Sequence, residues 1–445
     1  MSKSEVALSR RIGLFDATMI VMGGIIGAGI FVNPSVVARQ VNTPFLIVGV
    51  WVLGGLIALA AAFIWAELAA LRPEVGGQYA YLREAYHPIV AFLYGWTLLL
   101  VIQTGGMAAV AVTFARYFIK LTNLPIGEAA LAASTLGLLT GINCVGVRAG
   151  SMVQSFLMVL KIFAILGLIV AGLYVIANGS VGSQPGSVGL LGQPGSLSIV
   201  TAVGAAMVPV LFAYGGWQTS TFIAGEIREP RRNLPRALLV GVTGVVILYL
   251  AVNFVCVTAL GSDRLAQTLT PASDVMQLAL GPVGAGGIAA GIAISTLGFL
   301  SQGMLTAPRV YFAMAHDGLF FPAVARVHPR TQVPIVAIVL QGILAIVIAL
   351  WGYYEQILNY VVSVDFIFFG ATALCVFVYR RRGFQSQEKS VRMIPGHPIT
   401  TALFITACWL VVINTIYRYP GDTVIGLIIL VAGVPAYFFW RRRKA

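Results

Sequence analysis

Charged residues are scarce in this chain. Only 10% of its 445 residues are Asp, Glu, Lys or Arg, whereas a soluble domain has about 25%. The four histidines fall in loops or at the ends of apolar segments, and no cluster of acids, histidines or nucleophiles emerges. The sequence also lacks the glycine-rich P-loop of nucleotide-driven pumps. These absences argue against an enzyme, a metal site or a bound cofactor, and we expect none of the three.

Cysteine is also rare. The four cysteines lie in or at the ends of apolar segments, and none forms a Cys-x-x-Cys pair. They are Cys144, Cys256, Cys375 and Cys408. A free cysteine packs as a small apolar residue, so we expect neither a disulfide nor a metal ligand among them.

Long apolar runs dominate what is present. The chain is 59% hydrophobic with a mean hydropathy of +0.91, and an apolar run of about 20 residues is long enough to cross a bilayer as a helix. The sequence predicts an all-α integral membrane protein, with one transmembrane domain over residues 1–445 and twelve transmembrane helices. The approximate spans are 14–39, 44–71, 88–117, 126–144, 149–177, 199–225, 234–261, 284–314, 333–351, 356–380, 398–417 and 421–440.

The positive charge predicts the orientation of these spans. With the N-terminus inside, most of the 28 Lys and Arg residues fall in loops on the inner side, which is the bias of cytoplasmic loops. We therefore expect both termini to be cytoplasmic. The basic loops would meet anionic lipid, and the net charge of +13 does not indicate a nucleic acid partner.

Two of the spans contain glycine clusters at matching places. The first span has four glycines between residues 23 and 29, and the sixth has Gly215 and Gly216. Each glycine weakens a helix by roughly 0.5–1 kcal/mol, so the clusters predict unwinding. Unwound backbone is tolerated inside a membrane only where it lines a cavity or a ligand. The sequence thus predicts that helices 1 and 6 are discontinuous.

The same positions predict an inverted repeat. Residues 177–198, rich in Gly, Ser and Pro and free of charge, form an outer connection between a first half, 14–177, and a second half, 199–380. Each half has five spans, and because five is odd the halves enter the membrane in opposite senses. Residues 398–440 add two helices outside this 5+5 repeat. Substrates bind between such repeats near the middle of the membrane.

Peptide groups at the two breaks suit a substrate that carries one negative and one positive charge. A helix that restarts in the first span exposes amides that attract an anion, and a helix that stops in the sixth exposes carbonyls that attract a cation. An α-amino acid carries that pair of charges; the alternative is that the glycines only permit close helix packing. The predicted amide donors are Gly27, Ala28 and Gly29, and the predicted carbonyl groups are Ile25, Phe212, Ala213 and Gly215.

Lys161 lies deep in the fifth span, where an unpartnered lysine costs at least about 2.5 kcal/mol by insertion scales. Carbonyls freed by the first break are candidate partners, together with hydroxyls in the eighth span. Those hydroxyls are Ser295, Thr296 and Ser301. A lysine held in this way replaces a bound sodium ion, which predicts sodium-independent transport. A structural ammonium, or coupling through loss of its proton, are the alternatives.

Three further residues are candidates for gating or selectivity. Asp365 in the tenth span lines an outer vestibule, binds a cationic substrate side chain, or is a structural acid. Trp217 follows the second break. Glu226, like Glu67, lies near the cytoplasmic end of its span and forms either an inner gate or a plain interfacial salt bridge. The arginines expected to pair with these two acids are Arg228, Arg231 and Arg232.

On these residues the chain resembles the amino acid–polyamine–organocation superfamily, and within it the L-type amino acid transporter branch and its bacterial relatives. The matching stretches are residues 27–31, 73–81, 212–217, 233–237 and 309–318. The resemblance implies a LeuT-like fold in which a bundle of spans 1, 2, 6 and 7 rocks. It also implies that Phe212 covers the bound substrate and that Lys161 occupies the place of a sodium ion.

The resemblance bears on partners as well. Animal light subunits of this branch carry a cysteine between spans three and four that joins a heavy chain, but residues 117–128 contain none. We therefore expect no disulfide-linked heavy subunit and a bacterial inner-membrane setting.

The leading hypothesis is a sodium-independent secondary transporter of neutral L-amino acids that works by exchange or facilitated diffusion. One alternative is a proton-coupled symporter or antiporter of cationic amino acids or polyamines. The other, from a different class, is a membrane sensor that binds an amino acid without moving it.

Overall fold

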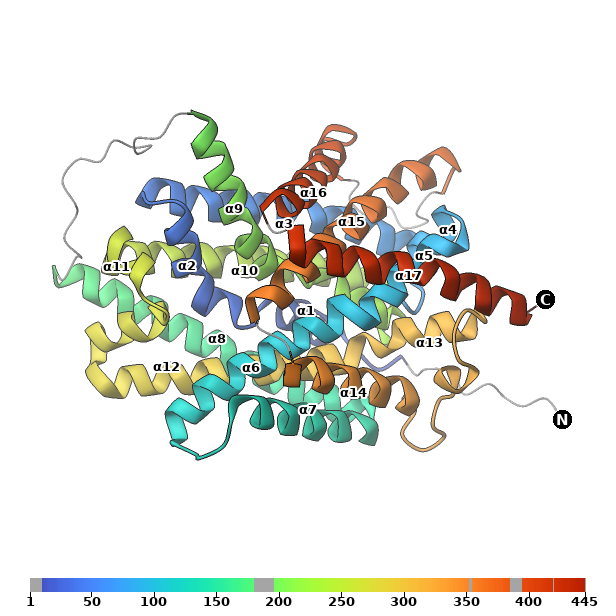
Figure 1. Cartoon of the computed structure of the whole chain (residues 1–445), viewed down its shortest axis with the longest axis horizontal. Helices are drawn as coiled ribbons and strands as arrows, with labels where there is room; N and C mark the ends of the chain where they lie inside the picture. The colour runs from blue at the N-terminus through green and yellow to red at the C-terminus, as the bar shows by residue number, and fades with distance from the viewer. Residues whose placement is uncertain (1–9, 180–195, 352–353, 385–393, 419, 445) are drawn as a thin grey trace.

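The protein is almost entirely helical. The computed structural model describes residues 10–179, 196–351, 354–384, 394–418 and 420–444 (Figure 1). Within these ranges the only extended pairing is an isolated parallel bridge between Ile12 and Ile227. Most of the connection predicted at residues 177–198 lies outside the described residues.

The helices follow one another from end to end of the described chain. Their bounds are α1 Leu14–Ile25, α2 Gly29–Gln40, α3 Pro44–Leu71, α4 Gln78–Ala85, α5 Pro88–Thr97, η1 Leu98–Ile102, α6 Gln103–Thr122, α7 Glu128–Val145, α8 Val147–Ala177, α9 Ser196–Tyr214, η2 Trp217–Glu226, α10 Pro230–Leu260, α11 Ser262–Gln267, α12 Pro271–Thr306, α13 Pro308–His316, η3 Pro322–Ala325, α14 Ile335–Trp351, α15 Tyr354–Arg381, α16 Ile399–Arg418 and α17 Pro420–Lys444.

The helices match the predicted spans in number and place. In the described residues, 11 helical stretches are long and apolar enough to cross a membrane, and the shorter apolar helix α14 occupies the ninth predicted span. Large apolar side chains also remain exposed on outward faces, as Phe163 (67%) and Val170 (66%) do seven residues apart on α8. Such a stripe suits contact with lipid tails. The prediction of a multi-pass, all-α membrane protein is confirmed.

Local sequence explains where several helices begin and change. Thr43 caps α3 by accepting a hydrogen bond from the Leu46 amide, with Pro44 at the first helical position, a favoured start. The third span changes to a π-helical turn at η1 before α6 starts at Gln103. The eighth span begins earlier than predicted, because α12 runs from Pro271 and bends at Gly281, whose φ is +64°.

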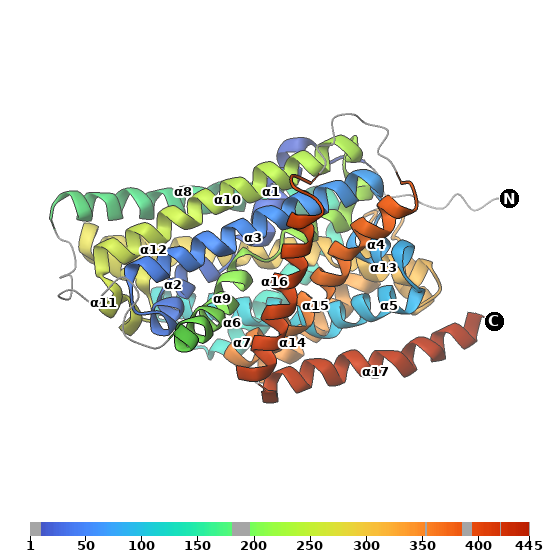
Figure 2. The ribbon, with the colours of Figure 1, turned by 90° about the horizontal axis from the view of Figure 1, so that it is seen from above.

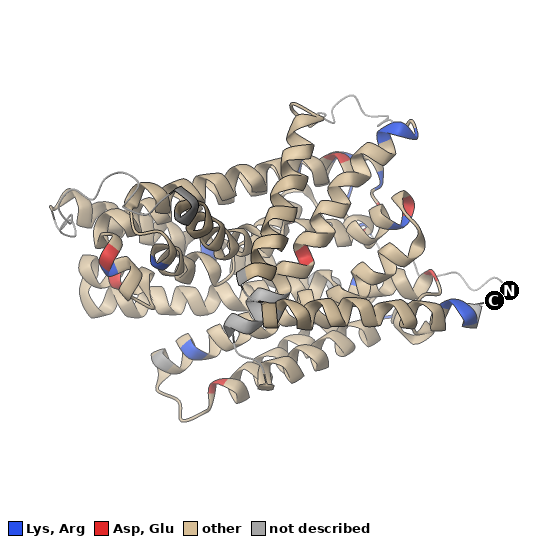
Figure 3. Cartoon of the chain, turned by 45° about the horizontal axis from the view of Figure 1, so that its top comes forward, with Lys and Arg blue, Asp and Glu red and all other residues tan. Residues whose placement is uncertain are grey.

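The long helices run roughly side by side along the longest axis of the molecule. Helix α10 packs against α3 and α8, and α12 packs against α8 and α6, while α16 crosses the bundle steeply (Figure 2). Helices α4 and α13 and the C-terminal end of α17 lie toward one end of the molecule, and α11 lies toward the other (Figures 1 and 2). Charged residues lie mostly toward the two ends, and the middle of the bundle is nearly free of them (Figure 3).

Candidate functional site

The first span is interrupted at the predicted glycines. Helix α1 ends at Ile25, the chain is extended at Ile26, and α2 begins at Gly29. In the described part of the chain, the amides of Gly27, Ala28 and Gly29 have no hydrogen-bond acceptor. They are the free donors that the N-terminus of any helix leaves, here placed in the middle of a span.

Three successive carbonyls at this interruption are each bound by a side chain from a different helix. The Tyr249 hydroxyl of α10 donates to the Ile25 carbonyl at 3.2 Å. The Lys161 ammonium of α8 donates to the Ile26 carbonyl at 2.6 Å, and the Ser295 hydroxyl of α12 donates to the Gly27 carbonyl at 3.3 Å. These bonds satisfy carbonyls that the broken helix would otherwise leave unpaired in an apolar core.

The sixth span is interrupted at Gly215 and Gly216. Helix α9 ends at Tyr214, and the 3₁₀ helix η2 starts at Trp217. Gly216 has a φ of +111°, and a Cβ at this position would overlap the Gly24 carbonyl of the first span. Glycine is therefore needed at Gly216 both for its conformation and for the close approach of the two interrupted spans.

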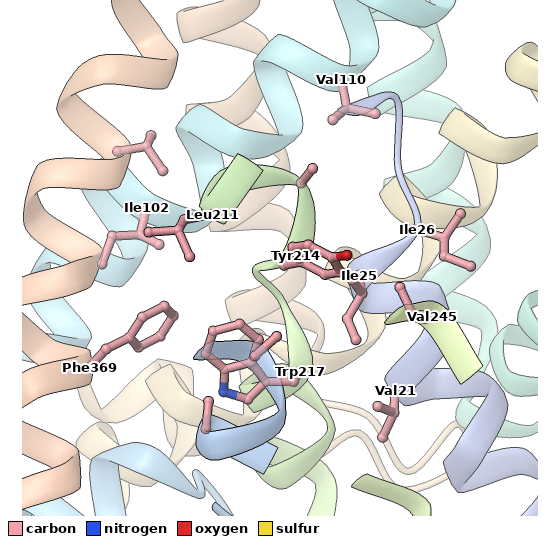
Figure 4. Packing of buried hydrophobic residues seen from close by; sticks show 14 of the residues in the cluster. Val21, Ile25, Ile26, Ile102, Val110, Leu211, Tyr214, Trp217, Val245 and Phe369 are labelled. Atoms are coloured by element: carbon pink, nitrogen blue, oxygen red, sulfur yellow. The ribbon is translucent and has the colours of Figure 1, made fainter. Parts of the chain in front are cut away.

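One cavity lies where the two interruptions meet. Every residue predicted to bind the charged ends of a substrate lines it, and so does Asp365; η1, α6, α12 and α15 complete the wall. The lining residues are Gly24, Ile25, Gly27, Ala28, Gly29, Ile102, Gln103, Gly106, Val110, Leu211, Phe212, Ala213, Gly215, Gly216, Gln218, Thr219, Phe299, Gln302, Val361, Val362, Asp365, Phe366 and Phe369. Figure 4 shows Ile25, Leu211 and Phe369 around this region.

Lys161 lies outside the cavity lining and is fully buried. Its ammonium donates to the Ile26 carbonyl, which is one of the carbonyls freed by the first interruption that were expected to bind it. Thr296, one of the hydroxyls expected beside it, donates instead to carbonyls of its own helix. Gly298 of α12 makes room for the lysine, because a Cβ there would lie 2.8 Å from Lys161 Cε.

Trp217 does not line the cavity but supports its wall. Its ring is buried, and it packs against Phe369 with ring centroids 5.0 Å apart and against Trp65 at 6.0 Å (Figure 4). Because Phe369 lines the cavity, Trp217 contacts the site through that ring. The structure thus gives it a packing position one layer behind the cavity.

The expected partners of Glu226 and Glu67 are wrong. Glu226 pairs with Arg309 of α13 at 2.8 Å, with both side chains almost fully buried, and Glu67 pairs with Arg380 of α15 at 2.8 Å. The arginines that follow the sixth span are instead exposed to solvent. They are Arg228, Arg231 and Arg232.

Further ion pairs gather where α4 meets α13. Arg83 binds Asp317 at 2.7 Å and Glu74 at 2.9 Å, and the Tyr79 hydroxyl donates to Asp317 at 2.8 Å. Burial and then the neighbouring Asp317 carboxylate raise the pKa of Tyr79 well above its usual value, so the phenol stays protonated as a donor. These contacts join the loop helix α4 to the end of the eighth span.

Several polar residues of the site were not predicted from the sequence. Gln302 of α12 donates to the Thr219 hydroxyl at 2.7 Å, and the Gln218 side chain accepts from the Gly216 amide at 3.1 Å. Gln103 starts α6 directly after the π-helical turn and also lines the cavity. A glutamine inside an apolar span is expensive unless it has a role, and that signal would have found Gln103 and Gln302.

Comparisons with known proteins agree with this geometry. The family model for amino acid permeases matches residues 12–434. The chain is 30% identical over 448 residues to the human large neutral amino acids transporter small subunit 2, covering 98% of this chain and 82% of that protein. It is 28% identical over 458 residues to the serine/threonine exchanger SteT of Bacillus subtilis, covering all of both chains. It is 29% identical over 419 residues to the mouse b(0,+)-type amino acid transporter 1, covering 90% and 82%.

The fold and these relatives define a multi-pass membrane transporter. More narrowly, the chain belongs to the amino acid permease family. The resemblance to L-type amino acid transporters and their bacterial relatives is confirmed, and these relatives are transporters rather than enzymes.

Proposed function

We propose that the protein is a sodium-independent exchanger of L-amino acids that works by alternating access. The observation that carries the proposal is that both helix interruptions line the same cavity. In this proposal the amides of Gly27, Ala28 and Gly29 bind the substrate carboxylate. The carbonyls of Ile25, Phe212, Ala213 and Gly215 bind its ammonium.

Hydrogen bonding at the cavity leaves capacity for this substrate. The amides of the first interruption have no acceptor in the described residues, so an incoming carboxylate gives them one. The Ile25 carbonyl already accepts from Tyr249, but a carbonyl oxygen has two lone pairs and can accept a second bond. Phe212 lines the same cavity and is partly exposed, as a ring that covers the substrate would be.

Sodium independence is proposed from Lys161. Its ammonium donates to a carbonyl freed by the first interruption, and Ser295 binds the next carbonyl along. A carbonyl and a hydroxyl are ligands that a sodium ion would use. A fixed positive charge at this position makes a bound sodium ion unnecessary and repels one.

We further propose a LeuT-like arrangement with inverted repeats over residues 14–177 and 199–380. The interrupted spans are the first of each half, as such a repeat requires. The end of the molecule that carries α4 and α13 would face the cytoplasm of a bacterial cell, and both termini would lie on that side. Paired charges of the α4–α13 end would then close the inner side.

The known relatives support exchange of amino acids. One relative is a serine/threonine exchanger and two are amino acid transporters. One of these is a small subunit, but this chain has no cysteine in residues 117–128. We therefore propose that it acts without a disulfide-linked subunit.

Reconstitution tests the proposal directly. The purified chain in proteoliposomes should take up labelled amino acid only when unlabelled amino acid is inside, and replacing sodium with choline should leave the rate unchanged. Uptake that needs sodium would contradict the role of Lys161. Binding of amino acids without any uptake would identify a sensor and overturn the transport mechanism.

A further inference from the structure

Asp365 differs from every other residue in the cavity wall. It is the one charged side chain among the described residues that line the cavity. It lies on α15 between Val361, one turn before it, and Phe369, one turn after it, and both of these also line the cavity. Residues four apart share one face of a helix, so the carboxyl sits in the middle of an otherwise apolar face.

Among the described residues, no protein group neutralises this carboxyl. In the part of the chain that the structure describes, Asp365 Oδ1 is buried without a hydrogen-bond partner and no ion pair involves Asp365. Other acids in this region do have partners, since Glu67 binds Arg380 and Glu226 binds Arg309. Lys161, the buried cation near the cavity, is hydrogen-bonded to the Ile26 carbonyl.

The other polar side chains of the wall are engaged or uncharged. Gln302 donates to Thr219, and Gln218 accepts from the Gly216 amide. A buried carboxyl oxygen without a donor is costly, and the Asp365 side chain as a whole is only partly exposed. Natural proteins keep such a group mostly where a ligand or a proton completes it. The unmet acceptor at Asp365 therefore points to a donor that arrives from outside the protein.

The position of Asp365 suggests which part of a substrate supplies that donor. The peptide groups proposed for the two charged ends come from the first and sixth spans. The rest of the wall, from η1, α6, α12 and α15, is left for the substrate side chain. That remaining wall is apolar apart from Asp365 and the glutamines Gln103 and Gln302, so one strong acceptor faces the side chain.

We propose that Asp365 determines specificity by accepting a hydrogen bond from the substrate side chain. The substrate class is then L-amino acids whose side chain ends in a donor, either a hydroxyl or an ammonium, and not purely aliphatic ones of the same size. This inference rests on the proposed function of the cavity and adds the side-chain chemistry to it. An ammonium gains most, because charge-assisted hydrogen bonds are the strong ones.

Two pairs of amino acids matched in shape test the proposal. Threonine and valine differ by a hydroxyl in place of a methyl group, and ornithine and norleucine differ by an ammonium in place of a methyl group. Each is used to compete with labelled uptake into proteoliposomes that contain the full chain and internal amino acid. The wild type should prefer the donor-bearing member of at least one pair, by about 10- to 100-fold for ornithine or about 2- to 12-fold for threonine.

Two variants separate charge from hydrogen bonding. Asp365→Leu should abolish the preference for both donors, whereas Asp365→Asn keeps an acceptor oxygen and should lose only a preference for ornithine. Asp263→Asn removes an exposed carboxylate on α11, outside the cavity lining, and should change neither ratio. Size-exclusion chromatography of each variant shows whether it is folded, and Asp365→Asn preserves the shape if Asp365→Leu does not fold.

The outcomes distinguish this inference from the proposed function. If the wild type transports amino acids without preference in either pair, or if a folded Asp365 variant keeps the wild-type ratios, the specificity role of Asp365 is wrong and the exchanger stands. If the wild type moves no amino acid, the proposed function fails first.

Discussion

The hydrogen bond between Lys161 and the Ile26 carbonyl offers the sharpest test of how the first interruption is held. The ammonium is fully buried, and its 2.6 Å distance to the carbonyl is short. Lys161→Met keeps the length and the apolar stem of the side chain but removes the donor and the charge. It leaves the Ile26 carbonyl without its partner at a place where the chain has already left the helix.

The expected loss follows from the chemistry of this contact. A hydrogen bond to a charged group contributes about 1.5–3 kcal/mol, and a neutral one about 0.5–1.5 kcal/mol. If the interruption must be held for substrate to bind, Lys161→Met should weaken substrate binding by about 10- to 150-fold. Removal of a buried ammonium also relieves its desolvation, so thermal stability should fall by less than this affinity does.

Neighbouring carbonyls provide matched controls. Tyr249→Phe removes the donor to the Ile25 carbonyl, and Ser295→Ala removes the donor to the Gly27 carbonyl. Both contacts are neutral and longer, at 3.2 and 3.3 Å, so each variant should weaken binding by only about 2- to 12-fold.

The assay is equilibrium binding of a labelled amino acid to purified protein, followed by exchange in proteoliposomes. The reasoning predicts an order in which Lys161→Met has the largest effect and the two hydroxyl variants have smaller ones. A folded Lys161→Met protein with wild-type affinity and rate would refute it, because the ammonium would then have no part in shaping the site.

Three more predictions follow from the contacts around the site. Gly216→Ala should abolish substrate binding, because the added Cβ would overlap the Gly24 carbonyl. The control variant Gly286→Ala should bind normally, because a Cβ there meets open space. Equal binding by the two variants would contradict the required close approach of the two spans. Glu226→Ala should destabilise the protein by about 3–5 kcal/mol by leaving the buried Arg309 charge unpaired, and the double variant Glu226→Leu with Arg309→Met should melt at a higher temperature than the single one. Uptake in choline buffer should equal uptake in sodium buffer, and a sodium-stimulated rate would count against a lysine that replaces the ion.

The parts of this protein that could be predicted from the sequence are those set by local chemistry. Apolar runs must become helices in a bilayer because each backbone group needs an internal partner. The number and place of the spans could therefore be predicted from those runs. The interruptions were predictable for the same reason, since glycine runs are where those helices are weakest. The sequence also pointed to a freed carbonyl as the partner of Lys161, because a deep lysine demands one.

Contacts between distant segments were not predictable in this way. Glu226 was expected to pair with the arginines that follow it in the chain, yet Arg309, 83 residues away, lies closer in space. The nearby arginines can reach water, whereas Arg309 is buried and needs an anion. Burial decides such a pairing, and burial depends on how the sixth and eighth spans pack against each other.

The contacts of Glu226 also bear on how the proposed rocking bundle would move. Its carbonyl accepts from the amides of Arg11 and Ile12, and the Arg228 amide donates to the Ile12 carbonyl. Backbone hydrogen bonds therefore join the start of the first span to the end of the sixth. The Glu226 carboxylate binds Arg309, which belongs to α13 at the end of the eighth span. If spans 1 and 6 move together, the backbone bridge persists and the buried ion pair must separate. Opening at this end then exposes two charges to water, and hydration of the separated charges offsets much of the cost of breaking the pair.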